Sequence, residues 1–237
     1  MALATRHGLV SMIDSTFATP VNFHPIALGF DLVMHSATKY LNGHSDLNAG
    51  VLAGRRGLID AARKTLKLCG GALDPNSCFL LARGLKTLVL RIARHNDTAL
   101  TLAKMLAEHP RVHRTLHPGL PCHPQHDRAA RLFAGGGGMI AIELKAADEL
   151  TPAQTAEAFL SRLKLIVPAT SLSGVESIIC RPAVATHGGL TAEERARAGI
   201  SDALLRLSVG IEDAADLLGD LDQALADGAF SDAAATI

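Results

Sequence analysis

The sequence predicts an α/β fold, and two observations support this fold class. Along the first part of the chain, short apolar runs alternate with segments of helical periodicity, a pattern typical of helices layered on a parallel sheet. The 237 residues are 48% hydrophobic, which is enough for the core of roughly one large or two small domains.

Three apolar runs predict the strands of the first part, at 9–14, 30–35 and 49–53. A helical turn at 25–28 and a helix at 58–68 accompany them. Residues 75–109 have the longest helical periodicity, and we expect them to form one helix that Pro110 ends, because proline cannot continue the hydrogen-bond ladder.

The second part of the chain has the pattern of a smaller α/β domain. Strands are expected at 112–116, 139–144, 178–181 and 205–209, and helices at 153–163 and 214–225. We therefore expect a partial large domain over 1–110, ending in the long helix, and a small domain over 111–237. The tail at 227–237 is small and polar enough to fray.

The composition excludes several function classes. Lys+Arg and Asp+Glu number 23 each, and aromatic residues make up only 3%, so neither charge nor base stacking favours nucleic acid or an anionic membrane. No apolar run approaches the ~20 residues of a membrane span, and the first residues lack the pattern of a signal peptide. Four scattered cysteines without a Cys-x-x-Cys pair indicate a reducing, cytoplasmic setting.

Polar and charged side chains stand at the ends of two predicted strands. Asp14 ends the first apolar run, and Ser36, Thr38 and Lys39 directly follow the second. A carboxylate suits the ring nitrogen of pyridoxal phosphate, hydroxyls suit its phosphate and an amine suits its carbonyl carbon. We expect these four residues to bind that cofactor. Lys39 would be the catalytic residue, because partial burial favours the neutral, nucleophilic amine.

Seven segments form a longer pattern, at 14–20, 35–46, 83–88, 117–121, 171–177, 191–195 and 206–212. Their residues, order and spacing resemble those of the trans-sulfuration, or Cys/Met metabolism, family of pyridoxal-phosphate-dependent enzymes, which includes cystathionine gamma-lyases and gamma-synthases. The resemblance implies the C-terminal part of the large domain of a type I, aspartate-aminotransferase-like fold, followed by a small C-terminal domain.

The resemblance also implies residue roles and a reaction. Arg206 would bind the α-carboxylate of an amino-acid substrate with both arms of its guanidinium. Ser171 would contact the same carboxylate, and Glu176 matches a position linked to reaction choice. Asp14 would keep the ring nitrogen protonated. The expected reaction is elimination or replacement at the γ-carbon, or the β-carbon, of a sulfur amino acid such as cystathionine.

The chain departs from the family pattern at several places. Ser173 stands where the family usually has glycine, and would crowd the backbone if that position has a positive φ. Cys180 precedes Arg181 and Pro182, where a His-Pro pair is commoner. Family members are typically longer at the N-terminus, where they supply a phosphate loop and an aromatic residue stacked on the cofactor. The chain is therefore expected to be N-terminally truncated, and its one tyrosine, Tyr40, cannot supply the stacked ring.

Two other site types are disfavoured by the sequence. His117, Cys122, His123 and His126 lie in a proline-rich loop, but no carboxylate or second cysteine completes a familiar metal spacing, so no metal is expected. The four glycines at 135–138 precede a strand instead of following one, which favours a hinge over a phosphate loop. A nicotinamide oxidoreductase is set aside because no proper Gly-x-Gly-x-x-Gly turn is present.

Two hypotheses stay open. In the first, the chain is an enzyme that acts on a sulfur amino acid. It would work as a homo-oligomer, a dimer or tetramer, as members of the family usually do. Alternatively, it is an inactive remnant, or a partner subunit that completes its site only with another chain such as a full-length relative. Neither hypothesis involves nucleic acid or a membrane.

Overall fold

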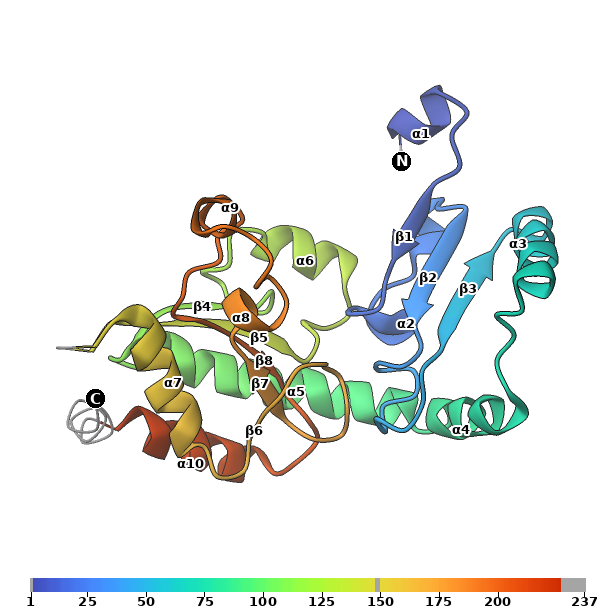
Figure 1. Cartoon of the computed structure of the whole chain (residues 1–237). Coiled ribbons are helices and arrows are strands. Elements are labelled where there is room, and N and C mark those ends of the chain that lie inside the picture. Colours follow the sequence, from blue (N-terminus) through green and yellow to red (C-terminus); the bar gives the residue numbers. More distant parts are fainter. Residues whose placement is uncertain (1, 148–149, 227–237) are drawn as a thin grey trace. The chain divides into compact units, whose positions relative to one another are not determined.

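The computed structural model describes residues 2–147 and 150–226 and has the mixed α/β fold that the sequence predicts (Figure 1). The chain divides into two compact units, Met1–Ala93 with Leu132–Gly135 and Arg94–Arg131 with Gly136–Ile237. The first is called unit 1 and the second unit 2. The domain limits of 1–110 and 111–237 remain a prediction, and the tail at 227–237 lies outside the described residues.

Unit 1 contains a three-stranded sheet in the order β1-β2-β3. β1 (Met12–Asp14) runs parallel to β2 (Leu32–Ser36), with Asp14 opposite Met34. β3 (Gly50–Gly54) runs antiparallel to β2, so the expected parallel pairing holds for β1 and β2 but not for β3. The physical reason is the connection: residues 37–49 contain turns but no crossover helix, and a parallel partner would usually need one.

In the chain, α1 (Ala2–Arg6) precedes this sheet, α2 (Thr19–Asn22) and the 3-10 turn η1 (Pro25–Leu28) connect β1 to β2, and α3 (Arg56–Cys69) follows β3. β1 begins three residues later than the sequence predicts. Leu9 and Val10 are 59% and 53% exposed and join no strand. Their apolar side chains made the prediction start the strand too early.

The prediction of a single helix over 75–109 is wrong, because Lys86 and Thr87 separate two helices. α4 (Pro75–Leu85) ends there and α5 (Leu88–Glu108) begins. At the break, the carbonyl oxygen of Gly84 accepts hydrogen bonds from Thr87 N, Thr87 Oγ1 and the guanidinium of Arg91. Those donors occupy the carbonyl that would otherwise continue the helical ladder.

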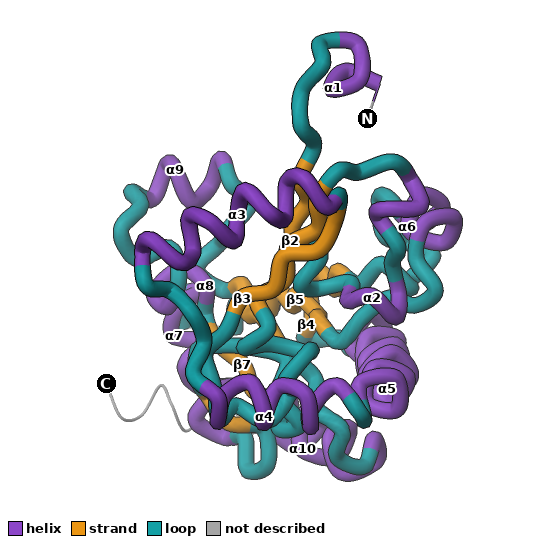
Figure 2. The backbone as a smooth tube through the Cα atoms, turned by 90° about the vertical axis from the view of Figure 1, so that its right-hand side faces the viewer, coloured by secondary structure: helices purple, strands orange, loops and turns teal. Residues whose placement is uncertain are grey.

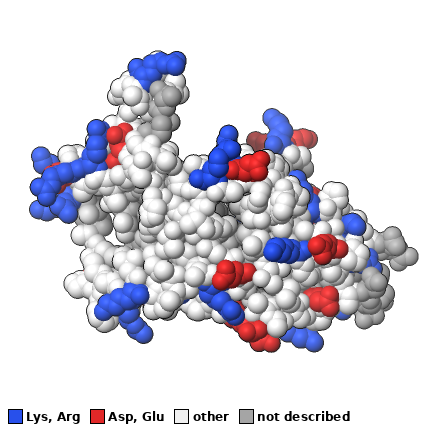
Figure 3. Space-filling view, turned by 180° about the vertical axis from the view of Figure 1, so that it is seen from behind, with Lys and Arg blue, Asp and Glu red and all other residues white. Residues whose placement is uncertain are grey.

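α3 lies beside β3 but buries none of its residues (Figure 2). Its polar side is basic, and Lys and Arg side chains gather over it (Figure 3). Between α3 and the sheet is an open pocket of about 510 Å³. Its lining, mostly apolar, consists of Met12, Met34, Gly50, Val51, Leu52, Ile59, Ala62, Arg63 and Leu66.

Unit 2 contains a five-stranded sheet in the order β4-β5-β8-β7-β6. The strands are β4 (Val112–Leu116), β5 (Met139–Leu144), β6 (Val167–Pro168), β7 (Ile178–Cys180) and β8 (Leu204–Ser208). All neighbouring pairs are antiparallel except β6 and β7. The four strands predicted for this part are confirmed, and only the two-residue β6 was missed.

Three of the helices of unit 2 begin at side-chain caps. The helices that follow α5 are α6 (His126–Leu132), α7 (Pro152–Arg162), α8 (Pro182–Ala185), α9 (Ala192–Arg197) and α10 (Ala214–Leu225). Thr151 with Gln154, and Thr191 with Glu194, form capping boxes that satisfy the first amides of α7 and α9. Asp213 caps α10, whose predicted limits are confirmed.

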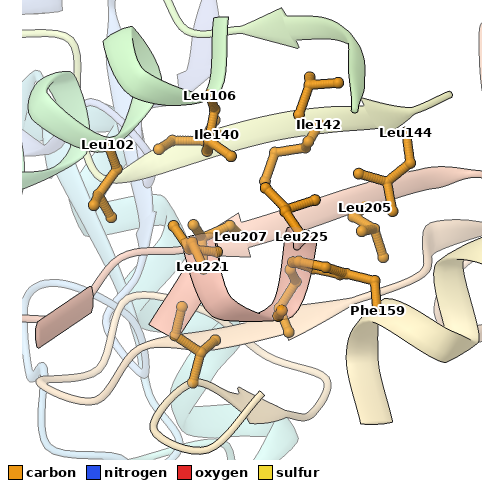
Figure 4. Packing of buried hydrophobic residues seen from close by; sticks show 14 of the residues in the cluster. Leu102, Leu106, Ile140, Ile142, Leu144, Phe159, Leu205, Leu207, Leu221 and Leu225 are labelled. Atoms are coloured by element: carbon orange, nitrogen blue, oxygen red, sulfur yellow. The ribbon is translucent and has the colours of Figure 1, made fainter. Parts of the chain in front are cut away.

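The core of unit 2 lies between its sheet and its long helices. Figure 4 shows Leu102 and Leu106 of α5, Phe159 of α7, and Leu221 and Leu225 of α10 around the strand residues. The labelled strand side chains are Ile140, Ile142, Leu144, Leu205 and Leu207. In the described ranges, no helix combines the length and the apolar composition needed to cross a bilayer.

The buried carboxylate of Asp220 holds the chain between α7 and β6. Its two oxygens accept hydrogen bonds from the backbone N–H groups of Lys164, Leu165 and Ile166 at 2.8–3.0 Å. Burial raises the pKa of Asp220, but these amides and Gln223 outweigh it, so the pKa is lowered. The ionised form therefore stabilises the fold above pH ~4, the ordinary aspartate pKa, and the stabilisation disappears as the pH falls through the folded-state pKa.

We expect Asp220→Asn to lower the free energy of unfolding at pH 7 by about 2 kcal/mol, because the charged acceptor of three amides is lost. The loss should shrink as the pH falls below ~4, where the wild-type carboxylate also becomes neutral. Urea denaturation at several pH values measures it. Asp222→Asn, at an exposed position of the same helix, is the control. An equal loss at pH 3 and pH 7 would contradict this role.

Candidate active site

Two predicted cofactor residues, Asp14 and Ser36, lie at adjacent strand ends. β1 and β2 are parallel and paired, so their carboxyl ends meet at one edge of the sheet. Asp14 is the last residue of β1 and Ser36 the last of β2. This edge is where ligands bind in open α/β sheets.

Thr16 joins these two strand ends, and sequence analysis missed it. Its hydroxyl donates a 2.5 Å hydrogen bond to Asp14 Oδ1 and accepts a 2.8 Å bond from the Ser36 backbone N–H. Thr16 N also donates to Oδ1, at 2.9 Å. The available signal was a threonine two residues after a strand-ending aspartate, a spacing that favours side-chain bonds to the local backbone.

The arrangement leaves one side of the Asp14 carboxylate available. Asp14 is exposed, and within the described ranges no residue donates a hydrogen bond to Oδ2. Thr16 fixes Oδ1 and thereby orients Oδ2. An oriented carboxylate oxygen at a strand end fits a protonated ring nitrogen, as the sequence-based expectation for Asp14 requires.

A pocket of about 340 Å³ lies beside Asp14. Its lining consists of Ile13, Asp14, Ser15, Thr16, Phe17, Ala18, Phe23 and Phe133. The rings of Phe23 and Phe133 meet edge to face, with centroids 4.9 Å apart. A mostly apolar pocket of this size with one carboxylate is typical of a small-molecule site.

The hydroxyls of Ser36 and Thr38 differ in availability. Thr38 Oγ1 accepts a 2.9 Å bond from Ala49 N and donates a 3.3 Å bond to Ala49 O, so it closes the loop back onto β3. Ser36 Oγ is half-buried and makes no hydrogen bond to a described residue. Of the two predicted phosphate donors, Ser36 is therefore the better placed.

Lys39 is half-buried in the turn that follows β2. Its backbone N–H donates to Ser36 O at 3.1 Å, and its carbonyl accepts from Gly43 N at 2.7 Å. Tyr40 and Leu41, the next two residues, are buried against Leu88 and Ile92 at the start of α5. The lysine is therefore mounted on an ordered turn, anchored on the core of unit 1.

His35 lies on β2 directly before Ser36 and is 7% exposed. Burial lowers the pKa of His35, and the nearby charge of Asp14 opposes that effect. The imidazole is therefore neutral at pH 7, so His35 places no positive charge near the Asp14 carboxylate.

The predicted substrate residues belong to unit 2. Arg206, on β8, donates a 2.8 Å hydrogen bond from Nη2 to the carbonyl of Ser171. Cys180 is the register partner of Arg206 on β7; burial raises the pKa of its thiol, and Arg206 partly offsets that rise. The Glu176 carboxylate lies over Gly174, where an added Cβ would be 2.4 Å from Oε1. The structure thus groups Arg206, Ser171 and Glu176 in unit 2 and Asp14, Ser36, Thr38 and Lys39 in unit 1.

Backbone strain is concentrated in the proposed site segments. In the described part of the chain, four residues other than glycine have a positive φ: Thr19, Ser45, Ser171 and Ser173. Each lies in one of the segments 14–20, 35–46 and 171–177. Such conformations cost about 1–3 kcal/mol each and cluster at functional sites.

The histidine loop does not group its side chains around a metal. In the described ranges no cluster of three or more His, Cys, Asp or Glu residues could hold a metal ion. His117 Nδ1 accepts from Gly119 N and its Nε2 bonds to Gly137 O, while His126 Nδ1 bonds to Pro118 O. These ring nitrogens therefore stabilise the loop itself.

Comparisons with known proteins cover nearly the whole chain. The sequence profile of the Cys/Met metabolism PLP-dependent enzymes matches residues 1–226. A cystathionine gamma-lyase of Dictyostelium discoideum is 47% identical over 92% of this chain and 55% of its own length. An L-methionine gamma-lyase of Pseudomonas deceptionensis is also 47% identical, over 93% of this chain and 55% of its own length.

Solved structures agree with this similarity. A cystathionine gamma synthase from Xanthomonas oryzae pv. oryzae, crystallised in complex with aminoacrylate and cysteine, superimposes with a TM-score of 0.90 at 41% identity. The match covers 100% of this chain and 59% of that one. The chain thus spans about half the length of the curated relatives it matches.

Ser173 provides a test of the strained loop, because it has a φ of 70° and is fully buried. We expect Ser173→Gly to change the free energy of unfolding by no more than about 1 kcal/mol, since glycine accepts this φ but loses a side-chain bond. Ser173→Val should cost about 2–3 kcal/mol, because a β-branched side chain fits neither the φ nor the packing.

Urea denaturation of both variants measures the difference. Ser161→Val, at an exposed position, serves as the control and should shift stability by no more than about 0.5 kcal/mol. Equal stability of the valine and glycine variants at position 173 would mean that this backbone conformation is not required.

Proposed function

Because this chain belongs to the Cys/Met metabolism family of PLP-dependent enzymes, we propose that it binds pyridoxal phosphate at the carboxyl ends of β1 and β2. The reaction we propose is γ-elimination or γ-replacement on a sulfur amino acid. The observation that carries the proposal is that Asp14 and Ser36 end adjacent parallel strands, and Thr16 connects Asp14 Oδ1 to Ser36 N. Asp14 Oδ2 and Ser36 Oγ make no hydrogen bond to a described residue, and Lys39 follows three residues after Ser36.

Asp14, Ser36 and Lys39 would hold the cofactor. When bound, pyridoxal phosphate supplies an electron-withdrawing ring that stabilises negative charge at the substrate's α-carbon. Asp14 Oδ2 accepts the hydrogen of the ring nitrogen and keeps that nitrogen protonated. Ser36 Oγ donates to the phosphate, and Thr38 supports it by holding the loop to Ala49. Lys39 Nζ would hold the cofactor at its aldehyde carbon.

Lys39 also moves protons in this proposal. With substrate bound, Lys39 Nζ would remove the proton from the substrate's α-carbon as a general base and would return a proton at a later position as a general acid. The turn at 36–43 would keep the backbone of Lys39 in place during these proton transfers.

Unit 2 supplies the substrate contacts. Arg206 binds the α-carboxylate through its guanidinium fork, while its bond to Ser171 O fixes the side chain. Ser171 would contact the same carboxylate, and Glu176, whose carboxylate lies over Gly174, would influence the choice of reaction. The high-pKa thiol of Cys180 stays protonated and so places no negative charge beside Arg206.

A second candidate function is favoured by the exposed apolar surface of unit 1. Met12 and Met34 are 57% and 38% exposed, and α3 buries no residue. The curated relatives have a little under half of their length outside the matched part. We propose that another polypeptide, either a second copy or a full-length relative, covers this surface, and that the chain completes its site as a partner subunit.

The cofactor proposal predicts a visible absorption band when the purified chain is mixed with pyridoxal phosphate. The band should be absent in Lys39→Ala and present in Lys64→Ala, a control on the exposed side of α3. Borohydride reduction followed by peptide mass spectrometry should locate the cofactor on Lys39. A band of equal strength in Lys39→Ala would exclude Lys39 as the binding residue.

A graded series tests the supporting residues in the same assay. Thr16→Val removes the donor that orients Asp14 and should weaken cofactor affinity about tenfold, the value of one charge-assisted hydrogen bond. Asp14→Asn should weaken it at least as much. Release of keto acid from cystathionine or methionine then measures turnover, which Lys39→Ala should abolish.

The partner hypothesis predicts association in solution. Size-exclusion chromatography with light scattering should give a mass above 24.8 kDa, the mass of one chain, either alone or with a full-length relative. Met34→Glu places a charge on the exposed sheet face and should shift the chain to monomer. A wild-type chain that stays monomeric in both settings would exclude this hypothesis.

A further inference from the structure

Arg91 is a buried cation that has no carboxylate partner among the described residues. It is 4% exposed, and burial lowers its pKa, with no charged group contributing. Burying a guanidinium is costly unless all its donors are satisfied. The Arg91 guanidinium makes four hydrogen bonds to described residues, all to neutral oxygens, so its donors and not an ion pair hold it in place.

Those donors join two segments that are about fifty residues apart in the sequence. Nη1 donates to Tyr40 O at 2.8 Å, and Nη2 donates to Gly84 O at 2.9 Å and to Leu41 O at 3.4 Å. Nε donates to Thr87 Oγ1 at 3.1 Å. Arg91 therefore holds the two residues after Lys39 against the break between α4 and α5.

Two glycines make this close approach sterically possible. A Cβ at Gly43, which has a φ of 73°, would lie 2.1 Å from Arg91 Nη1. A Cβ at Gly84 would lie 2.4 Å from the carbonyl oxygen of Asn42. The Lys39 turn, the helix break and the guanidinium thus fit together only without side chains at these two positions.

We infer that Arg91 is a positioning residue for Lys39, an inference that rests on the proposed role of Lys39 as the cofactor-binding amine. The bonds to Tyr40 O and Leu41 O fix the backbone on one side of Lys39, and the bond from Lys39 N to Ser36 O fixes the other. A planar fork is needed because one ammonium group cannot reach acceptors on both segments with the same geometry.

The test compares Arg91→Lys and Arg91→Met with a matched control, Arg181→Met. Arg181 is also a buried arginine, 8% exposed, but it lies in unit 2 and pairs with Glu157. Two quantities are measured for each folded variant. One is the amide hydrogen exchange of residues 39–43 against that of strand β5. The other is the fraction of chains that capture pyridoxal phosphate at Lys39 under limiting cofactor, trapped by borohydride and located by mass spectrometry.

In Arg91→Lys we expect exchange of the 39–43 amides to rise about tenfold and capture at Lys39 to fall about tenfold, because local opening of the turn replaces its fixed state. Strand β5 should exchange as in the wild type, and Arg181→Met should match the wild type in both measurements. Arg91→Met should show a larger change of the same kind. If Arg91→Met does not fold, Arg91→Lys alone decides, because it keeps the charge.

Wild-type exchange at 39–43 and wild-type capture in a folded Arg91→Lys chain would overturn the inference. An equal rise of exchange in strand β5, or an equal loss of capture in Arg181→Met, would also overturn it, because the effect would then be general destabilisation. Absence of capture in the wild type would contradict the proposed function instead, and the exchange of residues 39–43 would still decide whether Arg91 holds the turn.

Discussion

The Lys39 turn and the break between α4 and α5 depend on a single buried guanidinium. Arg91 connects the Lys39 turn to the interruption between α4 and α5, and its hydrogen bonds explain features that otherwise look unrelated. The helix ends at residue 85 because the Gly84 carbonyl faces Arg91 and Thr87. The turn after β2 closes tightly because its carbonyls face the same side chain. The local fold and the mounting of the proposed catalytic lysine are therefore one arrangement.

The sequence predicted most elements because their signals are local. Proline and capping residues mark the starts of α7 and α10, and alternating apolar residues mark β5. The motifs around Asp14 and Lys39 likewise suggested the strand ends that the structure brings together. The interruption of the predicted 75–109 helix could not be predicted this way. Its cause is a hydrogen bond from Arg91 to the carbonyl of Gly84, and Arg91 lies within the helical pattern itself.

The hydrogen-bond roles of the site residues could not be predicted from the spacing of residues in the sequence, because they depend on contacts in the folded chain. Thr38 and Ser36 look equivalent in the sequence, yet Ala49, across the loop, occupies only the hydroxyl of Thr38. Thr16 gained its role because the β1–β2 register places it against Ser36 N. The possible strain at Ser173 was foreseen from the expected glycine, and its φ of 70° agrees with that concern. The strain at Thr19 and Ser45 had no such signal.

The open edge of β1 has a consequence for the behaviour of the purified chain. Within the described residues β1 pairs only with β2, so its other edge presents unpaired backbone groups beside exposed Leu9, Val10 and Met12. Such an edge is a template for adding a strand from another molecule. With a formal net charge of zero, the chain also has little electrostatic repulsion to oppose that addition. Colloidal stability should therefore fall steeply with protein concentration, and a covering polypeptide would protect solubility as well as complete a fold.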